Sequence, residues 1–242
     1  MTVHRLSGPR RPSKRMVRAA GLRPVVLAVF GFIAAALVYP QSAMAACSQI
    51  TSTRPGEVYL FRGLGNIASL GPDEMANQFS KLGMKNCVDN HVNWMEYAND
   101  ILERSVGTSV SFPIIIIGHS LGARAAVSMA NYLGGRGVPV AHVAMFDPME
   151  STRVGWNIGE VVNYYVKIPL MTKLVRPGDG FTGTIENVGL SGWSGVSHFN
   201  IDNRKGLQFN VYVRALNLSN EAMMDLSETA DADLSDAPNA EN

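Results

Sequence analysis

The sequence predicts an α/β fold in which a mostly parallel sheet of about six strands is covered by helices on both faces. Two observations predict this class. Apolar runs of strand length alternate with segments of helical periodicity, and several of the runs are apolar throughout. Strands buried on both faces need such runs, whereas a strand with one solvated face alternates apolar and polar residues. The 242 residues suit one sizeable domain.

The elements alternate in order along the chain, each bounded by a turn signal. A short apolar strand ends in a glycine-rich turn, a helix follows until Gly83 stops it, and a weaker strand and a second helix lead to a run of four isoleucines. An alanine-rich helix then ends at two glycines, and further apolar strands precede a closing helix. The predicted strands are 58–61, 85–88, 113–117, 138–146, 161–168 and 184–188, and the predicted helices are 72–82, 93–106, 123–132 and 204–216.

The two ends of the chain have different compositions from the middle. Residues 1–46 carry seven Lys and Arg and no acid, then an apolar stretch of about fifteen residues and small residues at 43 and 45. This layout predicts a secretory signal peptide or, alternatively, a signal anchor, and export to the periplasm or the medium. Residues 47–56 read as a linker, and the acidic stretch 217–242 as a disordered tail.

The charge distribution excludes a nucleic-acid partner, because the folded part is net negative. Export would take Cys47 and Cys87 to an oxidising compartment, where they could form a disulfide. The alternative is lipidation of Cys47, since the residues before it resemble a bacterial lipobox. Neither cysteine has metal-type spacing, so we expect no metal site.

The sequence GHSLG at 118–122 matches the nucleophile-elbow pattern G-x-S-x-G. It follows the isoleucine strand and opens the alanine-rich helix, which is the context that the motif requires. The tight turn needs glycine at Gly118 and Gly122, where a side chain would collide with the neighbouring strand or helix. We therefore predict Ser120 as a nucleophile.

A serine hydroxyl needs a histidine base, and an acid that orients the histidine. His198 lies in a loop after the last predicted strand and is the predicted base, with His91 as the alternative. His119 is expected to pack beneath the elbow and His142 to lie within a strand. Asp147, directly after an apolar strand, is the predicted acid, and Asp179 is its rival.

A tetrahedral intermediate also needs N–H donors for its oxyanion. The N–H of Leu121 lies at the start of the helix that follows the serine. The glycine-rich turn after the first strand supplies a second donor, for which we choose Leu64, with Gly63 and Gly65 shaping the loop.

Arg62-Gly63-Leu64, GHSLG, Asp147-Pro148 and His198, in this order, resemble the α/β-hydrolase superfamily, and especially its small lipase- or esterase-like serine hydrolases. The resemblance spans 57–216 and implies a minimal version of the fold, because no room remains for the usual first two strands. An arginine stands at Arg62 where many lipases have histidine. The short connections leave no obvious large lid.

This resemblance implies hydrolysis of carboxylic esters, of small molecules or lipids, through an acyl-enzyme and without a cofactor. The same apparatus serves acyltransferases and thioesterases, and an envelope protein that keeps the scaffold for binding is a third alternative. Membrane association would come through an uncleaved N-terminal segment or a lipidated Cys47.

Overall fold

The computed structural model describes residues 47–48, 50–64, 70–107, 109–167, 173–190 and 192–235, with side chains as far as 228. The predicted signal peptide at 1–46 lies outside these residues, as do Gly65 and residues 236–242 of the predicted tail. Within the described ranges, no helix combines the length and the apolar character needed to cross a bilayer.

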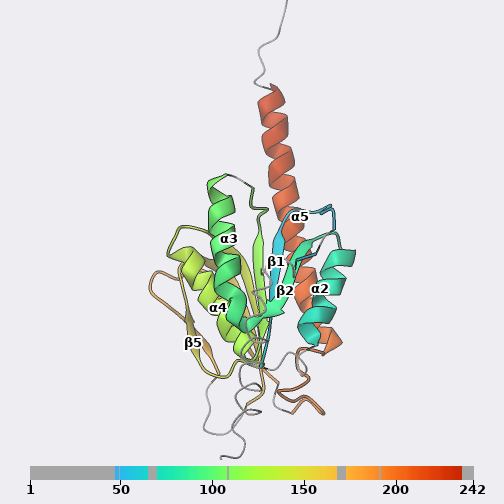
Figure 1. Cartoon of the computed structure of the whole chain (residues 1–242), viewed down its shortest axis with the longest axis vertical. Helices are drawn as coiled ribbons and strands as arrows, with labels where there is room; N and C mark the ends of the chain where they lie inside the picture. Colours follow the sequence, from blue (N-terminus) through green and yellow to red (C-terminus); the bar gives the residue numbers. More distant parts are fainter. Residues whose placement is uncertain are drawn as a thin grey trace, which may run out of the picture. The chain divides into compact units, whose positions relative to one another are not determined.

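The predicted class is confirmed, because six parallel strands form one sheet with helices on both faces (Figure 1). The strand order is β2-β1-β3-β4-β6-β8. These strands are β1 (Glu57–Arg62), β2 (Lys85–Asn90), β3 (Ile114–His119), β4 (Val140–Phe146), β6 (Ile158–Tyr165) and β8 (Thr184–Gly189). The described helices are α2 (Gly71–Lys81), α3 (Trp94–Val106), α4 (Leu121–Gly134) and α5 (Lys205–Ser235), and the 3₁₀ turn η2 (His91–Asn93) precedes α3.

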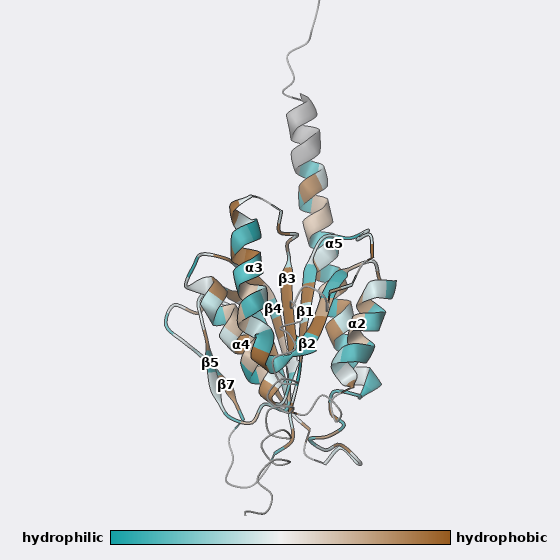
Figure 2. Cartoon of the chain, viewed as in Figure 1, coloured by the Kyte–Doolittle hydropathy of each residue, from teal (hydrophilic) through white to brown (hydrophobic). Residues whose placement is uncertain are grey.

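The four isoleucines of β3 are divided between the two faces of the sheet. Successive side chains point to opposite faces of the sheet. Ile114 and Ile116 pack in the core that α3 and α4 cover, whereas Ile115 and Ile117 pack in the core beneath α2 and α5. All four are fully buried, and the part of β3 that carries them is brown in Figure 2. At roughly 2 kcal/mol for each buried side chain, this strand contributes strongly to both layers.

A second, two-stranded parallel sheet consists of β5 (Thr152–Val154) and β7 (Val175–Pro177) and was not expected from the sequence. Each strand has only three residues and no apolar run, so neither has a recognisable strand pattern. β5 contacts α4. The two short strands lie in the connections from β4 to β6 and from β6 to β8, so the small sheet joins these two connections.

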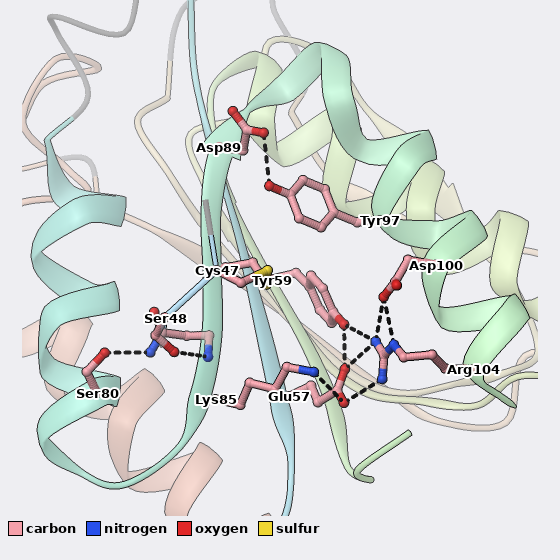
Figure 3. The surroundings of a disulfide bond; sticks show 12 residues. Cys47, Ser48, Glu57, Tyr59, Ser80, Lys85, Asp89, Tyr97, Asp100 and Arg104 are labelled. Carbon is pink, nitrogen blue, oxygen red and sulfur yellow. Dashed lines mark hydrogen bonds and ion pairs between the residues drawn. A yellow bond between two sulfur atoms is a disulfide. The ribbon is translucent and has the colours of Figure 1, made fainter. Parts of the chain in front are cut away.

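The expected linker 47–56 is tied to the domain. Cys47 and Cys87 form a disulfide, which joins the chain before β1 to the edge strand β2 (Figure 3). A sulfur in a disulfide cannot also carry a lipid thioether, so this bond and lipidation of Cys47 exclude each other. The N–H of Thr53 donates to the carbonyl of Gly83 at 3.0 Å. Backbone hydrogen bonds, which composition does not reveal, thus hold a segment whose sequence is typical of a linker.

Figure 3 also shows a buried ion pair at the start of β1. Glu57 is 2% exposed, and both of its carboxylate oxygens accept hydrogen bonds from Arg104 of α3 at 2.8 Å. The hydroxyl of Tyr59 donates to the same carboxylate. This network joins α3 to the amino-terminal end of the sheet, opposite the ends from which the site is built.

The last helix continues well beyond the expected boundary at 216, so the prediction of disorder from 217 is wrong as far as Ser235. Leu207, Val211 and Ala215 are buried against the sheet, and Leu218 continues their spacing. Ser219 is fully buried and donates to the carbonyl of Pro55 at 2.7 Å. The acidic composition of the segment hid this docking, because only one helix turn past 216 takes part in it.

We expect Ser219→Ala to lower the free energy of unfolding by about 1 kcal/mol, because the substitution removes the buried hydroxyl that donates to the Pro55 carbonyl. Ser227→Ala is the matched control. The Ser227 hydroxyl also donates to a backbone carbonyl, that of Met224, but on the exposed part of the same helix. Urea unfolding of both variants measures the difference, and equal stabilities would contradict the docking of this turn.

Candidate active site

The site lies at the carboxyl ends of the parallel strands, between the loops that leave β1 and β3. These strands are neighbours, but α2 follows β1 on one face and α4 follows β3 on the other. The loops that leave them therefore diverge, and such a crevice is where open α/β sheets bind ligands. Leu64 follows β1 and Ser120 follows β3, so the sheet brings these two predicted residues to one place.

The turn from β3 into α4 holds Ser120 in an unusual backbone conformation, with φ 57° and ψ −117°. Non-glycine residues rarely have positive φ, and such strain occurs at functional sites. A Cβ on Gly118 would lie 2.1 Å from the carbonyl oxygen of Gly122, and one on Gly122 would lie 2.0 Å from that of Phe61. The two glycines thus let the helix begin directly against the strands.

The structure brings Ser120, His198 and Asp147 into one chain of contacts. The Nε2 atom of His198 lies 3.1 Å from the Ser120 hydroxyl oxygen. Its Nδ1 atom lies 2.6 Å from Oδ2 of Asp147. Because a carboxylate can only accept, Nδ1 carries the proton and donates it, which leaves the Nε2 lone pair free to accept from the hydroxyl. This arrangement can take a proton from Ser120.

Asp147 is fully buried directly after β4 and also has positive φ, at 47°. Its carboxylate accepts from Lys173 Nζ at 2.8 Å on each oxygen and from the Val166 N–H at 2.9 Å. Burial opposes ionisation of this carboxyl, but hydrogen bonds from His198, Lys173 and the Val166 N–H outweigh it. The pKa of Asp147 consequently lies below its ordinary value, and the group is an anion at neutral pH.

His119, the second residue of the GHSLG motif, lies beneath the elbow as expected and is 3% exposed. Its Nε2–H donates to the carbonyl oxygen of His198 at 2.8 Å, and its Nδ1 faces the buried carboxylate of Asp202 at 3.7 Å. Burial lowers the pKa of His119, partly opposed by Asp202, so the ring is neutral near pH 7. This contact fixes the backbone of the loop that carries His198.

A pocket of about 350 Å³ opens over the candidate nucleophile. Most of its wall is apolar, and none of the described residues that line it is Lys, Arg, Asp or Glu. Leu64 and Phe199 are 74% and 71% exposed at its mouth. Leu121 is the first residue of α4, where backbone N–H groups have no acceptor within the helix. The lining residues are Gly63, Leu64, His119, Ser120, Leu121, Met149, His198 and Phe199.

The alternatives considered from the sequence lie elsewhere. Asp179 is exposed in the turn after β7, and it is Asp147 that contacts His198. His91 lies in η2 and does not line the pocket. His142 is buried within β4, 3.5 Å from Glu160, whose carboxylate also pairs with Arg214. His142, with the Glu160 carboxylate as its neighbour, is thus a core histidine.

Sequence reasoning missed Lys173 and the contact between His119 and the loop of His198. A charged residue within the apolar stretch 168–175 is unusual, and this was the one signal that could have identified Lys173. No local pattern announces that one histidine holds the backbone of another. Within the part of the chain that the structure describes, no cluster of His, Cys, Asp and Glu could hold a metal ion.

No protein-family model matches the sequence, and no curated protein matches it. Among solved structures, the chain is similar to the thioesterase domain that cyclises the lipopeptide antibiotic surfactin, with 14% identity, a TM-score of 0.49 and coverage of 74% of this chain and 99% of that one. The thioesterase domain from the nocardicin cluster has 13% identity, a TM-score of 0.44 and coverage of 72% and 99%. A protein assigned to the α/β superfamily of hydrolases, from Xanthomonas campestris pv. campestris, has 13% identity, a TM-score of 0.38 and coverage of 65% and 99%.

The chain has an α/β-hydrolase-like fold. Its parallel six-stranded sheet, the order of the strands and the elbow between β3 and α4 are the features of that fold. As the sequence predicts, the sheet is a minimal one of six strands, and β1 is the first of them in the described part of the chain.

Gly122→Ala should lower the free energy of unfolding by about 3 kcal/mol, because the new methyl group meets the backbone carbonyl of Phe61, which cannot yield as a side chain does. Gly206→Ala is the matched control, since no atom lies within 4 Å of a Cβ built there. In α5, alanine should be neutral or stabilise the fold by up to about 1 kcal/mol. Chemical denaturation compares the two, and a Gly122→Ala protein as stable as the wild type would refute the close approach.

Proposed function

We propose that the protein is a serine hydrolase that cleaves carboxylic esters through an acyl-enzyme intermediate. The observation that carries this proposal is the chain of contacts from the Ser120 hydroxyl through His198 to Asp147, at 3.1 and 2.6 Å. A hydroxyl that donates to an imidazole, which in turn donates to a carboxylate, is the arrangement that makes serine a nucleophile. The pocket that opens over Ser120 supports access of a substrate to this hydroxyl.

In the first half of the reaction, Ser120 attacks the ester carbonyl carbon while Nε2 of His198 takes the hydroxyl proton. The buried anion of Asp147 stabilises the imidazolium that forms. The imidazolium then gives its proton to the leaving alcohol, and the acyl group stays on the serine. In the second half, water repeats the attack with the same histidine as base, and the acid product leaves.

The oxyanion formed in both halves needs N–H donors beside the serine. We assign this role to the backbone N–H groups of Leu121 and Leu64. Both residues line the pocket together with Ser120, and Leu121 stands at the positive end of the α4 dipole. A Cβ on Gly63 would lie 3.0 Å from Cβ of Ser120, so the loop that carries Leu64 passes very close to the nucleophile.

The pocket supports an uncharged, apolar acyl group as the part of the substrate that is recognised. Leu64, Met149 and Phe199 form exposed apolar walls, and the lining residues that the structure describes include no cation that could pair with an acidic substrate. Thioesters and esters of one acyl group would react at the same carbonyl. Hydrolysis and acyl transfer are separated by product analysis after an alcohol acceptor has been added.

A fluorophosphonate probe should label the wild-type protein covalently, and Ser120→Ala should abolish the labelling while the fold is retained. Ser109→Ala, which removes an exposed hydroxyl elsewhere, should label like the wild type. Intact-mass spectrometry reads the adduct. Folded wild-type protein that does not react would oppose this function and would favour a scaffold that only binds.

Asp147→Asn should reduce kcat for a p-nitrophenyl ester by about three to four orders of magnitude, because the amide no longer holds the imidazole tautomer or stabilises its charge. Asp179→Asn should retain wild-type turnover, since that carboxylate is exposed and lies outside the contact chain. Near-UV circular dichroism verifies that both proteins are folded. Comparable losses in the two variants, or a loss in Asp179→Asn alone, would rule out Asp147 as the acid.

A further inference from the structure

Lys173 is a buried cation on the far side of the candidate acid. The residue is 2% exposed, and its Nζ lies 2.8 Å from each carboxylate oxygen of Asp147. Its charge therefore faces the carboxylate that Nδ1 of His198 contacts, in a region from which water is largely excluded. The triad as a chemical device needs serine, histidine and an acid, and a lysine is no part of it.

The backbone on both sides of Lys173 is anchored. The carbonyl of Lys173 accepts from the side chain of Asn163, which is fully buried in β6, at 2.7 Å. The next N–H, that of Leu174, donates to the Ser151 hydroxyl at 3.1 Å. The ammonium group is thus delivered to Asp147 from a fixed point, and not by a mobile surface side chain.

A buried ammonium group is costly unless it is paired, and an apolar residue of similar volume usually serves stability as well or better. Stability therefore does not explain why a charged residue stands at this position. The groups that face the Asp147–His198 pair are Lys173, the neutral ring of His119 and, behind that ring, the carboxylate of Asp202. Lys173 is the cation among these groups.

The direction of its effect follows from electrostatics. An anion beside an imidazole favours the protonated ring, and a cation beside that anion weakens this influence. Lys173, 2.8 Å from both oxygens of Asp147, therefore weakens the hold of that carboxylate on a proton taken up by the His198 ring. A general base must be unprotonated to act, so the enzyme gains activity on the acidic side of its pH profile.

We propose that Lys173 is a positioning residue that fixes both oxygens of Asp147 and, through its charge, extends ester hydrolysis to lower pH. The proposal rests on the function given above. It makes the unit at this site a group of four, Ser120, His198, Asp147 and Lys173, in which the last member acts only through the third.

The test compares Lys173→Met with the wild type in the pH dependence of kcat/KM and in a proton NMR titration of the His198 ring. Removing the cation should move the midpoint of the acidic limb, and of the ring titration, upward by about one pH unit. Lys205→Met is the matched control, because Lys205 is an exposed lysine paired with Glu74. The acidic limb of the kcat/KM profile of Lys205→Met should have the same midpoint as that of the wild type.

Lys173→Gln is the second variant. It keeps an N–H donor for Asp147 but removes the charge, so it should fold where methionine does not and should shift the limb in the same direction. A lower kcat with both midpoints unmoved, or midpoints that move downward, would overturn the proposal and leave Lys173 a structural residue. The ring titration needs no turnover, so it decides the role of Lys173 even if the fluorophosphonate test rejects the hydrolase.

Discussion

The site depends on a close approach between two backbones that only glycine permits. Gly118 and Gly122 place the first turn of α4 against the ends of β1 and β3, with carbonyl oxygens where a methyl group would otherwise lie. This approach sets Ser120 at the start of the helix and brings the loop after β1 beside it. Asp147 then reaches the site from the end of β4, and His198 reaches it from the chain after β8. A wider turn would separate the hydroxyl, the helix N-terminus and the loop of Leu64.

Polar groups with very little exposure to water hold the loop of His198 on two sides. His119 fixes its backbone carbonyl, and Asp147 fixes its ring. Each of these partners has a further buried group behind it, Asp202 in one case and Lys173 in the other. Such groups stay inside a fold only when nearly all of their hydrogen bonds are made. The loop is therefore tied to two networks that resist rearrangement, although most of its neighbouring residues are accessible.

The sequence predicts the layers of this protein well, because burial on both faces of a parallel sheet requires unbroken apolar runs such as 114–117. The sequence also points to Ser120, Asp147 and His198, which lie in one chain of contacts, since each follows a strand and has a local context. Other features have no local pattern. The short strands β5 and β7 are defined by their mutual pairing, and the docking of Ser219 depends on a carbonyl 164 residues away. Lys173 pairs with a carboxylate 26 residues before it, which no periodicity reports. Long-range contacts between single residues are the part that the sequence does not reveal.

The disulfide at the edge of the sheet has a consequence for solubility. Edge strands carry unpaired N–H and C=O groups, which can recruit a strand of another molecule. Ser48 occupies this edge, donating its N–H to the Asn86 carbonyl at 2.7 Å and accepting from the Asn86 N–H through its hydroxyl. The bond from Cys47 to Cys87 anchors this short segment covalently beside those two hydrogen bonds. The oxidised chain thus covers its own outermost strand, whereas thiol reductants would uncover a template for aggregation.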